Sequence, residues 1–132
     1  MLLPVLLAAT TLLPGLWEYK TSLMGFGGEP ERKCLSKAEI DKFLTDPSNR
    51  HYDCSYSTRK VGAGSVTLEG VCANRKRPRE TVGLSLKGAY TPTTIDMKGV
   101  ARPKLAGLEL PLGAAVKAER VGECPAGETP TS

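Results

Sequence analysis

One stretch of the chain indicates the fold: residues 52–72, which read YDCSYSTRKVGAGSVTLEGVC. Small or apolar side chains recur there at every second position, and the glycines at 62 and 64 divide the run into two halves. A period of two is typical of a strand with one buried face, and a Gly-rich break between two such runs is typical of a tight turn. The stretch therefore predicts an antiparallel hairpin whose inner face carries Tyr52, Cys54, Tyr56 and Thr58 on one strand and Val66, Leu68, Gly70 and Cys72 on the other.

Further strands are expected on both sides of this hairpin. Alternation also marks residues 16–23, 82–87, 94–98 and, less regularly, 114–122. Turns are indicated at 14–15 and 91–92, a basic loop at 74–79, and a connection broken by proline and glycine at 103–113. Short strands joined by tight turns are typical of an antiparallel meander. We therefore expect a mainly β (α+β) fold: a single curved antiparallel sheet of about five to six strands, with one short helix and two disulfides.

The helix is expected from residue 37 to about residue 44. Ser36 and Glu39 have the spacing of a capping box, in which each side chain accepts a hydrogen bond from the other residue's backbone amide. Leu35 and Ile40 occupy the positions of a hydrophobic staple on either side of this cap. The Asp46-Pro47 pair ends the helix.

The two ends of the chain carry expectations of their own. Residues 1–10 read MLLPVLLAAT, an apolar run that resembles the end of a secretory signal peptide. The run is shorter than the roughly 20 residues that span a bilayer, so no transmembrane segment is expected. We expect residues 14–125 to form a single disulfide-bonded domain and residues 126–132 a disordered tail. The expected location is the periplasm or the exterior of the cell.

Four cysteines, at positions 34, 54, 72 and 124, are expected to form two disulfides, as is usual for an even number of cysteines in a small exported chain. Four cysteines permit three pairings. A hairpin centred on residue 63 places Cys54 opposite Cys72 at bridging distance, which leaves Cys34 to pair with Cys124. A slip of one residue in the register would turn one cysteine of the hairpin to the opposite face.

Several short motifs, taken together, resemble one protein family. They are Pro14-Gly-Leu-Trp-Glu18, Cys34-Leu-Ser before a short helix, the pair Cys54 and Cys72 on successive strands, and Arg120-Val-Gly-Glu-Cys-Pro125. In this order they resemble the small bacterial envelope proteins called domain of unknown function thirty-six seventeen. The resemblance implies periplasmic export and a β-rich fold, and it implies no established activity.

No residue pattern predicts an enzyme, a metal site or a cofactor. His51 is the single histidine, and its His-x-x-Cys spacing to Cys54 is no metal half-site once that cysteine is oxidised, because thiolate is the ligand. The Gly-x-Ser-x-Gly motif of many hydrolases is absent from the sequence. Residues 62–65 lack the Lys-Ser/Thr ending of a phosphate-binding loop. Trp17 is expected in the core rather than at a ligand platform.

The most unusual local feature is the run NRKRPR at residues 74–79. Its cations Arg75, Lys76, Arg77 and Arg79 suit an anionic partner, whereas the lack of interleaved aromatic residues argues against nucleic acid. We expect non-enzymatic binding of an envelope protein or an anionic lipid surface; a solvated loop that discourages strand aggregation is the structural alternative. The alternative function is a carrier of small apolar ligands or lipids, with a pocket between the sheet and residues 105–112. A hydrolase is not expected, and the sequence does not indicate the oligomeric state.

Overall fold

The computed structural model describes residues 11–23, 26–27, 29–48, 51–105 and 107–126 of the 132-residue chain. The elements in these residues are β1 (Gly15–Leu23), β2 (Phe26–Gly27), β3 (Glu31–Leu35), α1 (Lys37–Thr45), β4 (Tyr52–Gly62), β5 (Ser65–Asn74), β6 (Thr81–Thr91), β7 (Thr94–Leu105), β8 (Leu108–Glu109) and β9 (Leu112–Gly122). The predicted mainly β fold with one short helix is confirmed. The predictions of a signal remnant at 1–10 and of a disordered tail at 126–132 fall outside the described residues, apart from Ala126.

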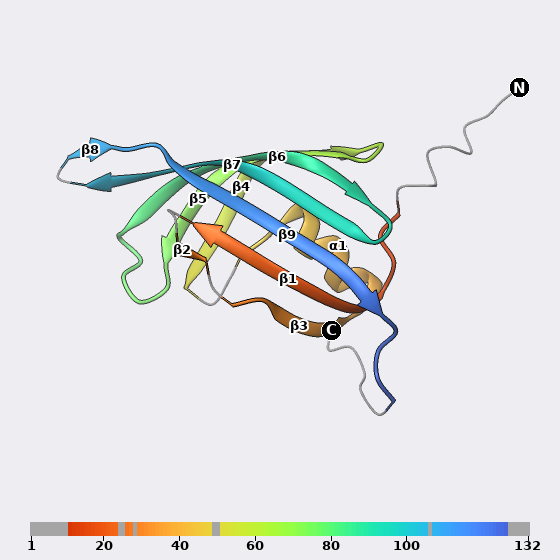
Figure 1. Ribbon diagram of the computed structural model, residues 1–132. Helices are drawn as coiled ribbons and strands as arrows, with labels where there is room; N and C mark the ends of the chain where they lie inside the picture. The colour runs from red at the N-terminus through yellow and green to blue at the C-terminus, as the bar shows by residue number, and fades with distance from the viewer. Residues whose placement is uncertain (1–10, 24–25, 28, 49–50, 106, 127–132) are drawn as a thin grey trace, which may run out of the picture.

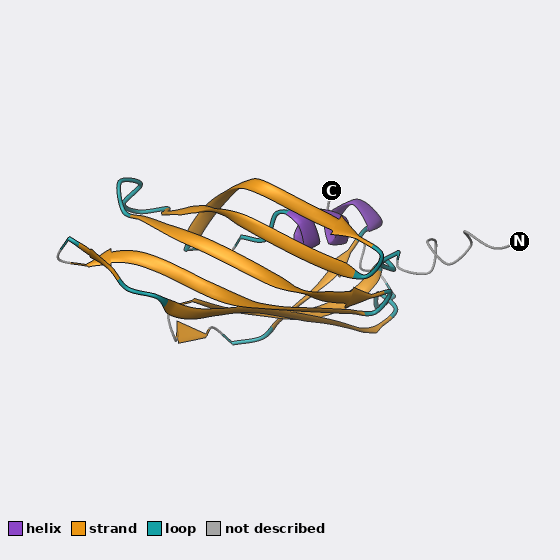
Figure 2. Cartoon of the chain, turned by 90° about the horizontal axis from the view of Figure 1, so that it is seen from above, coloured by secondary structure: helices purple, strands orange, loops and turns teal. Residues whose placement is uncertain are grey.

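The strands form one antiparallel sheet in the order β2-β1-β9-β7-β6-β5-β4, with β3 also beside β1 and β8 beside β7. The sheet curls into a half-barrel with α1 in its hollow (Figures 1 and 2). Strands β4 to β7 and β9 follow each other as the expected meander. Strand β1 then lies against β9, so that the first and the last long strands are neighbours.

The sheet has more strands than the five to six expected, because β2, β3 and β8 are added to the predicted ones. β3 reads ERKCL, without alternation, and it forms by pairing with Gly15–Tyr19 of β1. β8 forms because β7 runs on to Leu105 and the chain reverses near Gly107, whose φ of +81° favours glycine. The segment expected as an irregular connection, residues 103–113, is therefore a protruding hairpin.

In the β4–β5 hairpin Cys54 lies opposite Cys72 because a β-bulge shifts the register of β4. The turn residues Ala63 and Gly64 both have positive φ, 53° and 84°, as in the two-residue turns that match the twist of a hairpin. Next to this turn Val61 lies opposite Val66, a register that would bring Cys54 opposite residue 73. Ser57 has no partner in β5, because the register shifts between residues 56 and 58. This bulge brings Cys54 opposite Cys72. It also places Thr58 opposite Glu69, so the prediction that Thr58 lies on the inner face is wrong.

Two glycines on the inner face allow the strong curvature of the sheet. A Cβ added at Gly99 would collide with the carbonyl oxygen of Ser85, and one added at Gly88 would collide with that of Asp96. Ser85 lies on β6, opposite the strand that carries Gly99, and Asp96 lies on β7, opposite the strand that carries Gly88. Glycine therefore permits a backbone approach that any larger residue would block, and the sheet bends there.

The core lies between the inner face of the sheet and α1. Trp17 of β1 is fully buried and its Nε1 donates a hydrogen bond to the Leu13 carbonyl at 2.9 Å, so the expected core position is correct. Ser36 caps α1 as predicted: its Oγ accepts from the Glu39 amide (3.2 Å), and its own amide donates to Glu39 Oε1 (2.9 Å). The helix turns Ile40 and Leu44 into the core.

The structure contains two disulfides, Cys34–Cys124 and Cys54–Cys72, which are the two pairs derived from the sequence. Leu16 of β1 lies between Cys34 of β3 on one side and Gly122 of β9 on the other. The first disulfide therefore ties the helix-bearing edge of the sheet to the end of β9, across the beginning of β1. Its sequence separation is 90 residues, against 18 for the second disulfide.

Candidate anionic-surface site

The basic loop, residues 74–79, joins β5 to β6 and has a defined backbone. Asn74 Oδ1 accepts hydrogen bonds from the amides of Lys76 (2.9 Å) and Arg77 (3.1 Å). The Asn74 amide donates to the Glu80 carbonyl at 3.0 Å and closes the loop, while the Arg75 amide donates to the carbonyl of His51 at 3.0 Å. The loop therefore presents its cations from an ordered turn rather than from a loose tether.

The four predicted cations of this loop, Arg75, Lys76, Arg77 and Arg79, are all exposed and follow one another along the turn. Arg77 has a carboxylate partner, Glu80, at 3.4 Å. Both side chains of that pair are largely solvated, so water screens the attraction and leaves most of the positive field in place. The sequence prediction of an exposed basic cluster is thus met in its position, and its binding role stays a prediction.

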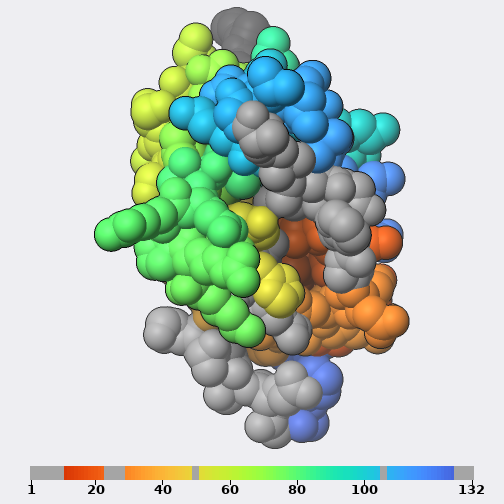
Figure 3. All heavy atoms as spheres, turned by 90° about the vertical axis from the view of Figure 1, so that its left-hand side faces the viewer, coloured from red at the N-terminus to blue at the C-terminus, as the bar shows by residue number. Residues whose placement is uncertain are grey.

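The basic loop lies at the same end of the molecule as the hairpin tip formed by β7 and β8. In Figures 1 and 2 both project from the end opposite the β4–β5 turn, and Figure 3 looks onto them directly. We call residues 107–112 the leucine arm. It carries Leu108 and Leu110, which are exposed to solvent. The sequence pattern predicted residues 105–112 as one wall of a pocket and did not indicate that Leu108 and Leu110 are exposed.

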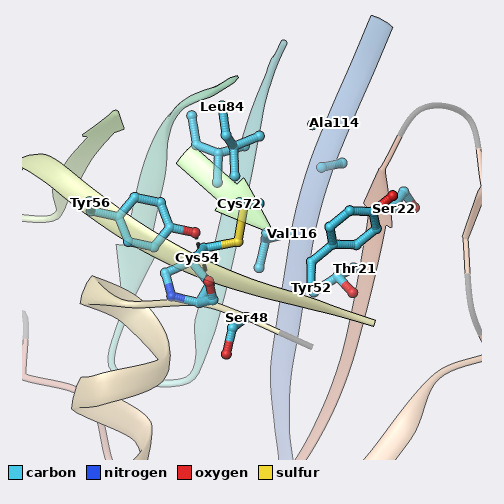
Figure 4. A pocket seen from close by; sticks show the side chains of 13 residues that line it. Thr21, Ser22, Ser48, Tyr52, Cys54, Tyr56, Cys72, Leu84, Ala114 and Val116 are labelled. Carbon is cyan, nitrogen blue, oxygen red and sulfur yellow. Dashed lines mark hydrogen bonds between the residues drawn. A yellow bond between two sulfur atoms is a disulfide. The ribbon is translucent and has the colours of Figure 1, made fainter. Parts of the chain in front are cut away.

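A small cavity opens beside these two features. Its volume is about 40 Å³, and its walls come from β1, β4, β5, β6, β9 and the residues that follow α1. In Figure 4 Leu84, Ala114 and Val116 form apolar walls, the Cys54–Cys72 disulfide lies between them, and the ring of Tyr52 lies beside Ser22 of β1. Figure 3 shows a hollow between the green loop and the arm, with atoms coloured as β4 and β1 at depth.

The cavity is not where the sequence suggested. The expected pocket lay between the sheet and residues 105–112, but no residue of that range lines the cavity among the residues that the structure describes. The segment 105–112 projects away as an arm, whereas Pro47 and Ser48, which follow the helix, close the cavity instead. A Pro/Gly-broken apolar segment predicts burial from composition alone, and it cannot reveal that β7 carries the segment beyond the sheet.

Behind the cavity, Tyr56 and Arg59 fasten the end of α1 to β4. Tyr56 Oη donates to the Pro47 carbonyl at 2.6 Å, as the dashed line in Figure 4 marks. Arg59 Nε donates to the Thr45 carbonyl at 2.9 Å, and its guanidinium lies 3.4 Å from Asp46 and 5.9 Å from the centroid of the Tyr56 ring. A cation at a helix C-terminus complements the partial negative charge there.

The environment of Tyr56 also shifts its ionisation. Burial raises the pKa of the Tyr56 phenol well above its usual value, and the carboxylate of Asp46 raises it further, while Arg59 opposes both effects. The phenol therefore stays neutral and keeps donating its hydrogen bond throughout the physiological range. The sequence predicted Tyr56 on the inner face, but nothing in the sequence pattern predicted its link to the helix.

The structure also shows where His51 and the four cysteines lie. His51 is exposed, and its backbone carbonyl accepts a hydrogen bond from the Arg75 amide of the basic loop. Within the described residues no three His, Cys, Asp or Glu side chains gather in a way that could hold a metal ion. All four cysteines are in disulfides and supply no thiolate. In the described part of the chain no helix has the length and apolarity that a bilayer crossing needs.

Comparison with known proteins identifies the family and little else. No curated protein and no solved structure matches the chain. A family model described as "Protein of unknown function (DUF3617)" matches residues 12–124, which span the half-barrel from the residues before β1 to the second cysteine of the long disulfide. This is the family that the Pro-Gly-Leu-Trp-Glu opening and the Gly-Glu-Cys-Pro ending resemble. The chain therefore belongs to the DUF3617 family.

Proposed function

We propose that this protein is an exported, non-enzymatic binding protein that attaches to an anionic surface of the cell envelope through its basic loop. The observation that carries the proposal is the exposed cluster Arg75, Lys76, Arg77 and Arg79 on an ordered turn. Four cations held this close together raise the local concentration of anions such as lipid phosphates. Two disulfides support export, because such bonds persist in oxidising compartments.

The distribution of charge along the chain also favours the basic loop as the binding surface. Residues 74–80 hold four cations and one carboxylate, a surplus of three positive charges. The whole chain has a net charge of +4, so all other residues together carry a surplus of only one. Most of the net positive charge of the chain is therefore carried by the basic loop.

The test is binding to vesicles of neutral phosphatidylcholine, with and without anionic phosphatidylglycerol. Replacing Arg75, Lys76, Arg77 and Arg79 by Ser should weaken binding to the anionic vesicles more than about a hundredfold, since each cation near such a surface contributes about fivefold. The melting temperature should not change, because these side chains are exposed.

The matched control removes the same charge elsewhere, by replacing the exposed lysines at 60, 87, 98 and 117 with Ser. That variant should keep most of the parent's affinity. Absence of binding by the parent at low ionic strength, where electrostatic attraction is strongest, would overturn the proposal. Equal losses in both variants would mean that net charge, and not the loop, governs binding.

A carrier of small apolar ligands is the alternative, and the apolar walls of the cavity favour it. The volume of about 40 Å³ is enough for only a few water molecules, whereas sites for organic ligands usually enclose about 300 Å³ or more. A carrier would have to widen this space by moving Tyr52 or the residues after α1. Native mass spectrometry of protein purified from the periplasm distinguishes the two functions, because a carrier retains lipid.

A further inference from the structure

We infer, resting on the proposed function, that the anionic surface is a lipid bilayer and that the leucine arm inserts into it beside the basic loop. Leu108 is 65% exposed, the highest value for a large apolar side chain in the described residues, and Leu110 is 40% exposed. Strand β8, which begins at Leu108, lies near the tip of a hairpin that extends past the rest of the sheet (Figures 1 and 2). An exposed leucine at a protruding tip gains from entering an apolar phase.

The backbone of the arm sets the direction of its side chains. Lys104 of β7 pairs with Glu109, and the Leu110 amide donates to the Pro103 carbonyl at 3.2 Å, so the paired geometry continues past β8. Residues two positions apart in an extended chain project to the same side. Leu108 and Leu110 therefore leave one side of the arm together, and Glu109 leaves the other side.

The positive charge beside the leucine arm favours an anionic bilayer as its binding partner. The basic loop projects from the same end as the arm, and Figure 3 shows both on one face. A bilayer with anionic headgroups offers phosphates to the cations and acyl chains to the leucines a few ångströms deeper, which matches a protein tip that carries both groups. A soluble polyanion would engage the cations and leave Leu108 and Leu110 in water. The pairing of the two features thus favours lipid over a polysaccharide or an acidic protein.

The test compares two double variants of the full disulfide-bonded chain. Leu108→Ser with Leu110→Ser should weaken binding to phosphatidylglycerol-containing vesicles about tenfold or more, as expected for two leucines that leave an apolar phase. It should leave binding to heparin beads unchanged, because heparin has no apolar phase. The matched control is Val61→Ser with Val121→Ser, two apolar residues that are 38% and 39% exposed near the opposite end, and it should bind both probes like the parent.

A fluorescent reporter gives a second, direct measurement. Trp17 is fully buried, so its emission should not respond to vesicles. In the variant Leu108→Trp, anionic vesicles should shift the added emission to shorter wavelength, and lipids brominated on their acyl chains should quench it. In Val61→Trp neither change should occur.

The outcomes separate the two proposals. A parent that binds neither vesicles nor heparin overturns the proposed function and this inference with it. A parent that binds both, together with a double leucine variant that binds vesicles equally well and an unshifted emission from the Leu108→Trp variant, overturns the inference alone. Loss of vesicle binding with retained heparin binding, together with the blue shift at position 108, supports insertion.

Discussion

At the scale of single residues, the bulge at Ser57 determines which side chains of β4 lie on the concave face of the sheet. The bulge lets Cys54, Tyr56 and Arg59 share one face, although they are not evenly spaced by two. The sequence pattern predicted the first two of these positions and missed Arg59, because strict alternation assigns it to the opposite face of the strand. A bulge leaves no mark in an alternation of polar and apolar residues, so the contact of Arg59 with the end of α1 could not be predicted from the pattern.

The hydrogen bond of Tyr56 makes a prediction that depends on pH. Tyr56→Phe removes the bond to the Pro47 carbonyl and should lower the free energy of unfolding by about 1 kcal/mol at neutral pH. Because the pKa of Tyr56 is raised in the folded protein, its unfolded form ionises first as the pH rises above about 10. The stabilisation by the neutral phenol is therefore complete below that pH and is lost progressively above it.

The difference between parent and Tyr56→Phe in urea unfolding should accordingly shrink at high pH. Urea titrations at neutral pH and at a series of alkaline values measure this difference. A gap that stays constant across the series would mean that the phenol ionises as easily in the folded state as in the unfolded state.

At the scale of elements, the predictable parts were those with a strong local signal. The helix starts at its capping box, and the long strands follow the period of two, because these patterns reflect which side chains each element buries. The strands β2, β3 and β8 escaped prediction because they are short or lack alternation and exist through pairing with a neighbour. The basic loop was predicted because its run of cations is also a local signal. The cavity depends on five strands and the residues after α1, which no local pattern brings together.

The capping box makes the prediction for the helix. Ser36→Ala removes the acceptor of the Glu39 amide and should lower the free energy of unfolding by about 1 kcal/mol. Ser36→Thr keeps a hydroxyl at this position and should cost less. The midpoints of urea unfolding measure both changes, and an unchanged midpoint in the Ala variant would show that water replaces the cap at no cost.

At the scale of the whole molecule, the two disulfides constrain very different lengths of chain. The Cys34–Cys124 bridge closes a loop with a separation of 90 residues, and the Cys54–Cys72 bridge one of 18. Chain entropy assigns about 4–5 kcal/mol to the long loop and about 3 kcal/mol to the short one. The long bridge also joins the chain next to β3 and β9, the two strands that flank β1.

Replacing each cysteine pair by alanine tests this difference. The variant without Cys34 and Cys124 should lose more stability than the variant without Cys54 and Cys72, as measured by urea unfolding under conditions that keep the remaining disulfide. The reverse order would indicate that the buried sulfur atom of Cys72, which is almost inaccessible to solvent, stabilises the core more than loop closure does.

One end of the molecule exposes the basic loop and the leucine arm, and hydrogen exchange tests most directly whether this end contacts the bilayer. Exchange would be followed by mass spectrometry with and without phosphatidylglycerol-containing vesicles. Our account predicts that vesicles slow exchange in peptides that cover residues 74–80 and 107–112, and that peptides covering the β4–β5 turn at 62–65 and the end of β9 do not change. Slower exchange at the β4–β5 turn, or no change at the basic loop while the protein is bound, would contradict it.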